Sequence, residues 1–196
     1  MKRGPATHSP RDERFMQRAI ELAARALGRT FPNPPVGAVF VRNGRIVGEG
    51  FTRPAGGPHA EIVALRRAGR RARRADLYVT LEPCSHHGRT PPCIDKLVPL
   101  GLRRVLIART DPNPRVRGRG IRALRAAGAE VSVGLGADIA DRLLYGHRSL
   151  VRRRRPWIAL KLAVSLDGRI ALASGRSRWI TGPAARRAGH RLRAES

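Results

Sequence analysis

The stretch Thr80–Cys93, TLEPCSHHGRTPPC, contains the only two cysteines of the chain, separated by eight residues. The apolar run Leu77–Leu81 that leads into it is typical of a short buried strand. A helix is expected from about Cys93 to Leu100. The stretch therefore predicts a strand, a polar loop and a helix, with Cys84 and Cys93 at the two ends of the loop.

Strands and helices alternate on both sides of this stretch. Ser9-Pro10 is a typical helix start, with proline at the first helical position, and Gly28 suits the cap at the end of that helix. Asn43-Gly44 favours a two-residue turn between strands. The other expected elements are strands at 36–41, 45–50, 103–108 and 130–133, and helices from 59 to beyond 65, at 118–127 and at 137–147. This order predicts an α/β fold, a three-layer α/β/α sandwich around a mixed five-stranded sheet.

The C-terminal part of the chain has too few elements for a core of its own. After a basic linker, Arg152–Arg155, the apolar run Trp157–Ser165 predicts a strand, Asp167-Gly168 a turn, and Gly182-Pro183 the start of a helix. A segment this short buries little apolar surface alone. We therefore expect one domain over residues 1–150, folded from residue 9, and a linker with the incomplete start of a second α/β domain over 151–196.

The charge balance is strongly basic, at +26 with 40 Lys and Arg against 14 Asp and Glu. Such a surplus supports binding to nucleic acid. However, the cations are scattered arginines and only 4% of residues are aromatic, whereas nucleic-acid readers concentrate charge or interleave it with aromatic rings. A composition bias or a substrate phosphate is therefore the favoured interpretation, and a nucleic-acid partner is not expected.

The sequence shows no sign of export or of membrane insertion. No apolar run reaches the roughly 18 residues of a membrane span. The segment Met1–Pro10 lacks the apolar centre of a secretory signal. We therefore expect a cytoplasmic protein that makes no contact with membranes.

A metal site is the favoured interpretation of the two cysteines, because a disulfide is unusual in a chain without an export signal. Together with His59 they supply one imidazole and two thiolates, a donor set that suits zinc. Three protein ligands leave the fourth tetrahedral position for water, as in catalytic zinc sites. The alternative is a structural site that His86 or His87 would close.

Glu61, two residues after His59, favours the catalytic alternative, because a structural site does not need it. Zinc lowers the pKa of bound water to about 7. A carboxylate beside the metal can take a proton from that water and pass it to a ring nitrogen and a departing amine. Hydrolytic removal of an amino group from a ring carbon requires such transfers. Glu61 is therefore the candidate proton carrier.

These motifs resemble those of the zinc nucleobase deaminases, whose usual signature is H-x-E followed by P-C-x-x-C. The chain departs from that signature in placing eight residues between its cysteines. With this spacing, the strings PNPPVGAV (Pro32–Val39), GGPHAE (Gly56–Glu61), TLEPCSHHGRTPPC and DPNP (Asp111–Pro114) are similar to the deaminase half of the bifunctional deaminase/reductases of riboflavin biosynthesis. The resemblance implies a cytidine-deaminase-like fold.

The resemblance also implies a substrate, 2,5-diamino-6-ribosylamino-4(3H)-pyrimidinone 5′-phosphate, which would lose its 2-amino group as ammonia. The expected ligands of zinc are His59, Cys84 and Cys93, with Glu61 catalytic. The family positions that contact the substrate correspond to Asn33, His86, Arg89, Asp111 and Asn113. Taken alone, Asn33, Asp111 and Asn113 are also ordinary turn formers, and Arg89 is also an ordinary solvated arginine.

The similarity continues through LKLAVSLDGRIA (Leu160–Ala171) and WITGP (Trp179–Pro183), which resemble the start of the reductase domain. Matching positions near cofactor and substrate are Lys161, Ala163, Ser177, Trp179 and Arg193. The glycine-rich stretch expected to bind the dinucleotide does not occur before Ser196. We therefore expect NADPH binding only in a complete domain and no reductase activity from this chain. A homo-oligomer and a separate reductase are the candidate protein partners; the alternative is that the chain is a fragment of a full bifunctional deaminase/NADPH-dependent reductase.

Two other functions are compatible with part of the pattern. A deaminase acting on a nucleic acid or another nucleobase would explain the basic charge, although the spacing of the cysteines argues against it. A non-catalytic zinc module that binds polyanions would have four protein ligands and no need of Glu61. The zinc module is distinguished from a deaminase by the fourth zinc position and by the effect of replacing Glu61. The nucleic-acid deaminase is distinguished by incubation with the pyrimidinone phosphate and, separately, with tRNA or single-stranded DNA.

Overall fold

The computed structural model describes residues 8–88 and 90–195. The chain divides into two compact units on either side of the bond between Pro156 and Trp157. Among the described residues, no helix combines the length and the apolar character needed to cross a membrane.

The first unit is built on one mixed sheet of five strands with the order β2-β1-β3-β4-β5. β1 pairs antiparallel with both β2 and β3, whereas β3, β4 and β5 run parallel. The strands are β1 Gly37–Arg42, β2 Arg45–Phe51, β3 Asp76–Leu81, β4 Arg104–Arg109 and β5 Glu130–Val133. Asn43 and Gly44, both with positive φ, form the turn between β1 and β2. The predicted five-stranded mixed sheet is confirmed.

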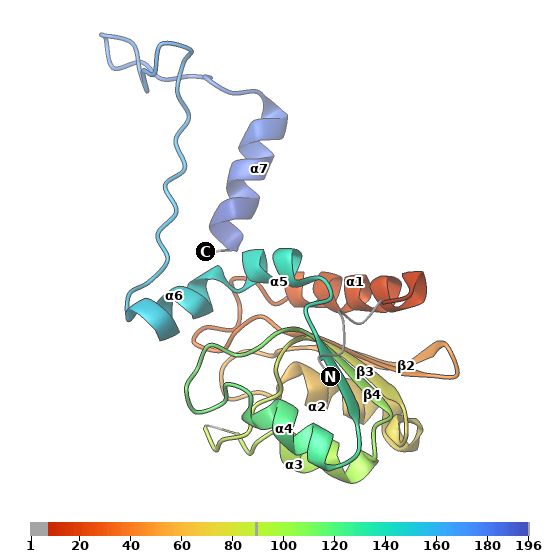
Figure 1. The fold of residues 1–196 in the computed structure, drawn as a ribbon. Helices are drawn as coiled ribbons and strands as arrows, with labels where there is room; N and C mark the ends of the chain where they lie inside the picture. The colour runs from red at the N-terminus through yellow and green to blue at the C-terminus, as the bar shows by residue number, and fades with distance from the viewer. Residues whose placement is uncertain (1–7, 89, 196) are drawn as a thin grey trace. The chain divides into compact units, whose positions relative to one another are not determined.

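Helices cover both faces of this sheet, as Figure 1 shows. On one face lie α1 (Pro10–Ala24) and α5 (Ala137–Leu143), packed over a core that includes Met16, Leu22 and Tyr78. On the other lie α2 (Ala60–Ala68), α3 (Ile94–Leu97) and α4 (Arg119–Ala126), over a core that includes Phe40 and Leu97. Short 3₁₀ turns, η1 (Gly69–Ala72) and η2 (Val98–Leu100), follow α2 and α3. The predicted three-layer sandwich is confirmed.

The close approach of α2 to β2 depends on two glycines. A Cβ on Gly48 would lie 2.4 Å from the carbonyl oxygen of Ala64, and a Cβ on Gly50 would lie 2.6 Å from the backbone nitrogen of the same residue. Real Cβ atoms do not approach backbone atoms so closely. The pair of glycines therefore sets where α2 lies, and with it His59, which is the N-cap of that helix.

An ionic network joins α1 to the end of the sheet where β3 and β4 begin. Asp12 forms a capping box with Ser9 at the start of α1. Its Oδ1 accepts hydrogen bonds from the Tyr78 hydroxyl at 2.5 Å and from Arg104 at 3.0 Å. Arg104 also donates to Asp76 at 2.7 Å. The network ties α1, β3 and β4 together.

Several expected element boundaries are wrong. α1 ends at Ala24, because the N–H groups of Arg25, Ala26 and Leu27 bond to carbonyls three residues back, which tightens the chain into turns before Gly28. The helix expected at 137–147 is two helices, α5 and α6 (Tyr145–Arg153). α6 therefore takes in Arg152 and Arg153, which were expected in a linker.

In the described part of the second unit there is one helix, α7 (Pro183–Ala194), which begins at Pro183 with Gly182 as its N-cap, as predicted. The turn at Asp167-Gly168 is also present, with the N–H of Gly168 bonded to the carbonyl of Ser165. The strand predicted over Trp157–Ser165 is wrong. This segment pairs with no strand among the described residues, and Ile158 and Leu160 are each 82% exposed. An apolar run without a partner strand has no ladder of hydrogen bonds to join.

Candidate metal and substrate site

The site lies along one edge of the sheet, where β3 and β4 end and β1 begins. Because β1 is antiparallel to β3, its first residues share an edge with the last residues of β3. The loop after β3 supplies Glu82 and Cys84, and the loop after β4 supplies Asp111 and Asn113. This topology explains why segments distant in sequence surround one cavity of about 290 Å³.

His59, Cys84 and Cys93 converge at one side of this cavity. The Nδ1 atom of His59 lies 3.5 Å from the Sγ of Cys84 and 3.3 Å from the Sγ of Cys93. The potential ligand atoms of the three residues all lie within 4.8 Å of one another. Two sulfurs and one imidazole nitrogen at this separation fit a tetrahedral zinc ion with one position left over.

The local electrostatics favour a cation in this group. A hydrogen bond from the Cys93 thiol lowers the pKa of Cys84, and the same contact raises the pKa of Cys93. The backbone N–H of Cys93 donates to the Sγ of Cys84 at 3.2 Å, which further favours its thiolate. The hydrogen bond between His59 and Cys84 raises the pKa of His59. The negative charge of this group therefore lies on the Cys84 thiolate, which would attract a metal cation.

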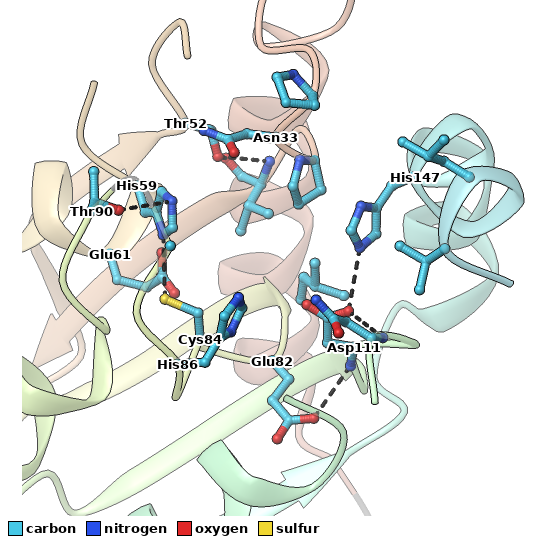
Figure 2. Close-up of a pocket in the computed structure, with 18 residues that line it drawn as sticks. Asn33, Thr52, His59, Glu61, Glu82, Cys84, His86, Thr90, Asp111 and His147 are labelled. Carbon is cyan, nitrogen blue, oxygen red and sulfur yellow. Dashed lines mark hydrogen bonds and ion pairs between the residues drawn. The ribbon is translucent and has the colours of Figure 1, made fainter. Parts of the chain in front are cut away.

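Glu61 lies in the first turn of α2, lines the same cavity and is only 4% exposed. Burial, and to a smaller extent the negative charge of Cys84, raises the pKa of its carboxyl group to about 7. A carboxyl group with a pKa near neutrality can both accept and donate a proton, which suits a general acid–base group. In Figure 2, Glu61 lies beside His59 and Cys84.

Among the described residues, the ligating group contains three members, and neither His86 nor His87 belongs to it. His86 lines the cavity and is half-buried, whereas His87 is exposed and is not among the lining residues that the structure describes. The arrangement therefore gives no support to a structural site closed by a fourth side chain.

Four of the five expected substrate residues line the cavity, namely Asn33, His86, Asp111 and Asn113. The fifth, Arg89, lies outside the described residues. Asn33 is held in its loop by Thr30, whose hydroxyl donates to the Asn33 carbonyl at 2.9 Å. Asp111 is 7% exposed, and its Oδ1 accepts the N–H of Asn113 at 2.8 Å.

Sequence reasoning missed Glu82, which organises the loop after β4. Its buried carboxylate accepts three backbone N–H groups, from Asp111 at 3.3 Å, Gly118 at 3.0 Å and Ile121 at 3.2 Å. A carboxylate directly after the buried strand in TLEPC was the available signal, since buried charges are paired with donors.

Thr52 and His147 were also missed. The backbone N–H of Val36 donates to the Thr52 hydroxyl at 3.2 Å, which ties the end of β2 to the start of β1 at the cavity. His147, on α6, lies with its Nε2 atom 3.3 Å from the Oδ1 of Asp111. Neither Thr52 nor His147 belongs to a sequence motif of catalytic or metal-binding residues, so the sequence alone offered no signal for them.

The second unit has a cavity of its own, of about 350 Å³. All five residues matched to reductase positions line it: Lys161, Ala163, Ser177, Trp179 and Arg193. Arg186, not predicted, also lines it, with its guanidinium carbon 4.1 Å from the centre of the Trp179 ring. The residues that line this cavity include three basic side chains, Lys161, Arg186 and Arg193.

Comparison with known proteins identifies two matched regions. Residues 9–109 match the cytidine and deoxycytidylate deaminase zinc-binding region, and residues 156–196 match the RibD C-terminal domain. The riboflavin biosynthesis protein RibD of Escherichia coli is 55% identical over 94% of this chain and 50% of its own length. The chain spans about half the length of the curated relatives it matches.

Solved structures give the same result. The structure of Acinetobacter baumannii RibD superposes with a TM-score of 0.87 at 50% identity, over 95% of this chain and 52% of that one. A diaminohydroxyphosphoribosylaminopyrimidine deaminase/5-amino-6-(5-phosphoribosylamino)uracil reductase from Thermotoga maritima also gives 0.87, at 47% identity over 93% and 53%. These findings confirm the resemblance inferred from the sequence motifs. Because the zinc-binding region covers more than half of its residues, the chain belongs to the cytidine and deoxycytidylate deaminase family, within which it is similar to the RibD proteins.

Proposed function

We propose that this chain catalyses the zinc-dependent hydrolytic deamination of 2,5-diamino-6-ribosylamino-4(3H)-pyrimidinone 5′-phosphate to 5-amino-6-ribosylaminouracil 5′-phosphate and ammonia. One observation carries the proposal: three potential ligating side chains, two of which line the cavity, lie together, and a buried carboxyl group of raised pKa lines the same cavity. A three-ligand group leaves room for water, and Glu61 is placed to handle its protons. The similarity to RibD proteins supports the choice of substrate.

Each residue has a defined role in this proposal. Zinc, held by His59, Cys84 and Cys93, would supply the Lewis acidity that activates water at neutral pH. Glu61 carries the first proton of the attacking water to the ring nitrogen. It then carries the proton of the new C2 hydroxyl to the 2-amino group, which leaves as ammonia as the C2 carbonyl forms. Its burial suits the task, because a pKa near neutrality lets the same carboxyl group serve first as base and then as acid.

Substrate recognition falls to the polar residues of the cavity. The amide of Asn33 can donate to and accept from a pyrimidine edge. Asp111 and Asn113 are suited to ribose hydroxyls, with His86 nearby. Arg89 is proposed for the 5′-phosphate from its sequence position, because a guanidinium binds phosphate bidentately.

The proposed deaminase domain comprises residues 9–150, and residues 151–196 are proposed as a linker and the start of a reductase domain. The match of 156–196 to the RibD C-terminal domain supports this division. We propose Lys161, Ala163, Ser177, Trp179 and Arg193 as its substrate or cofactor positions. NADPH would bind where a complete reductase domain is present.

The test is ammonia release by zinc-loaded protein from the pyrimidinone phosphate, with tRNA and single-stranded DNA as alternative substrates. We expect turnover of the pyrimidinone alone. Glu61→Gln should retain one zinc ion per chain, measured by elemental analysis, but lose at least about 10²-fold in kcat, because acid–base catalysis contributes on that order. Glu13→Gln, an exposed change on α1, is the matched control. Ammonia released only from nucleic acid, or full activity in Glu61→Gln, would overturn the proposal.

A further inference from the structure

The wall of the cavity that faces His59 and Cys84 comes from a part of the chain that neither family match covers. We call His59, Cys84 and Cys93 the metal group. Residues 110–155 lie between the two matched regions. They contribute Asp111, Asn113, His147, Leu150 and Val151 to the lining. The zinc-binding half is the shared part of the family, so this wall is where features particular to one substrate are expected.

His147 and Asp111 form a pair inside this wall. The Nε2 atom of His147 lies 3.3 Å from Asp111 Oδ1, and the two side chains are only 11% and 9% exposed. An ionised carboxylate can only accept hydrogen bonds, so Nε2 is the donor. The same oxygen accepts the N–H of Asn113. Two donors on Oδ1 fix the carboxylate, while Oδ2 has no hydrogen-bond partner among the residues that the structure describes.

α6 is anchored firmly enough to make His147 a fixed donor. The Oδ2 atom of Asp141, on α5, forms an ion pair at 2.5 Å with the Nη2 atom of Arg109, at the end of β4. Asp141 also forms an ion pair with Arg148, the neighbour of His147. At the end of the helix, the buried hydroxyl of Ser149 donates to the carbonyl of Arg155 at 2.9 Å. These contacts tie α6 to the same strand that leads into the Asp111 loop.

Figure 2 shows His147 and Asp111 across the cavity from His59, Glu61 and Cys84. A ring whose amino group is placed at Glu61 would therefore direct its sugar substituent toward Asp111. We propose that His147 is a positioning residue that holds the Asp111 carboxylate ready for a ribose hydroxyl, so that the site selects ribosyl over 2′-deoxyribosyl compounds. This inference rests on the proposed deaminase function and adds a specificity determinant to it.

The experiment measures binding rather than turnover, in a zinc-loaded Glu61→Gln background that keeps the substrate intact. The probes are the pyrimidinone ribosyl 5′-phosphate and its 2′-deoxyribosyl counterpart, titrated by calorimetry. Adding His147→Phe, which keeps a ring but removes the donor, should weaken binding of the ribosyl compound by about tenfold, equivalent to about 1.4 kcal/mol. Binding of the deoxyribosyl compound should change by less than about twofold, so the discrimination between the two is lost.

Two further variants separate positioning from a structural effect. Gln at position 147 presents an amide N–H near the place of Nε2, so His147→Gln should restore most of the affinity. In an Asp111→Asn background, His147→Phe should have little additional effect, because the residues act as a unit. Arg152→Gln, an exposed change on the same helix, should alter neither affinity.

The outcomes distinguish this inference from the function on which it rests. Equal weakening of both compounds by His147→Phe, or no change in either, would overturn the role of His147 alone. Failure of the Glu61→Gln protein itself to bind the ribosyl compound, together with absence of ammonia release by the unaltered protein, would overturn the proposed substrate as well. Zinc content and melting temperature, measured for every variant, show whether each protein is folded.

Discussion

Glu82 is a buried carboxylate that accepts three backbone N–H groups, from Asp111 in the loop after β4, from Gly118 at the N-cap of α4 and from Ile121 in the first turn of α4. Removing it would leave these donors without the acceptor that now satisfies them, and unsatisfied buried polar groups cost about 1–3 kcal/mol each. The loop also carries Asp111 and Asn113, so its disturbance reaches the cavity. Glu82 therefore links the stability of the fold to the shape of the site.

For Glu82→Ala we expect the free energy of unfolding to fall by about 2–4 kcal/mol, because three backbone donors lose their acceptor. Water that enters the space should satisfy some of them and limit the loss. KM for the proposed substrate should rise more than kcat falls, because the loop carries Asp111 and Asn113, which are proposed to contact the ribose, and none of the proposed metal ligands. Zinc content should stay at that of the unaltered protein. Denaturant unfolding, kinetics and elemental analysis measure the three quantities, with exposed Glu13→Ala as control. Loss of zinc with unchanged KM would contradict this role.

At the scale of elements, the metal group depends on where α2 lies, and Gly50 limits its distance from β2. A Cβ at Gly50 would lie 2.6 Å from the backbone nitrogen of Ala64 and 2.8 Å from the carbonyl oxygen of Ala60. Backbone atoms cannot move aside as a flexible side chain can, so the whole helix must shift. His59 and Glu61 lie at its N-terminal end and would shift with it.

Gly50→Ala should therefore destabilise the fold by about 1–3 kcal/mol, the usual cost of overpacking. Zinc affinity, measured by competition with a chelator, should fall as well. Gly146→Ala is the control: apart from its chain neighbours and the backbone of its own helix, no atom lies within 4 Å of a Cβ at that position, so stability should hold or rise by about 0.5–1 kcal/mol. An unchanged zinc affinity in Gly50→Ala would show that α2 absorbs the shift without moving His59.

Local patterns predicted most of these elements, and the failures have physical causes. The Asn43-Gly44 turn and the Ser9-Pro10 helix start depend on neighbouring residues, and both are present. The strand expected over Trp157–Ser165 needs a partner strand, which a local apolar pattern cannot guarantee. The break between α5 and α6 is likewise tertiary, because α6 packs its His147 against Asp111 from another loop.

The same distinction applies to the site. His59, Glu61, Cys84 and Cys93 could be predicted because their types and spacing express one chemistry, and the fold brings them together. Glu82 and His147 act through contacts with residues 29 and 36 positions away, respectively. No short-range pattern marks such pairs, so only the structure reveals them.

At the scale of the whole molecule, the ionic network around Asp12 joins α1, β3 and β4 and makes stability depend on pH. Burial alone would raise the pKa of Asp12, but hydrogen bonds from Tyr78, Ser9 and Arg104 outweigh it and hold this pKa below its usual range. A carboxylate with a lowered folded-state pKa stabilises the fold at pH values above its unfolded-state pKa, about 3.9. This contribution is lost as the pH falls from there through the folded-state pKa.

We therefore expect the midpoint of urea unfolding to be insensitive to the Asp12 carboxylate between about pH 5 and 7 and to fall steeply below about pH 4. Asp12→Asn should lower the midpoint at pH 6, because the neutral amide is a poorer partner for Arg104, and should flatten the decline in acid. Glu13→Gln, at the next and exposed position of α1, leaves the acid decline unchanged. The proposed zinc site of His59, Cys84 and Cys93 would be a second source of acid sensitivity, since protonated thiols release zinc. Unfolding of the metal-free protein separates the two sources. If the midpoint no longer falls in acid once the metal is removed, the decline comes from the cysteines. If the midpoint still falls and Asp12→Asn flattens the decline, it comes from the ionic network.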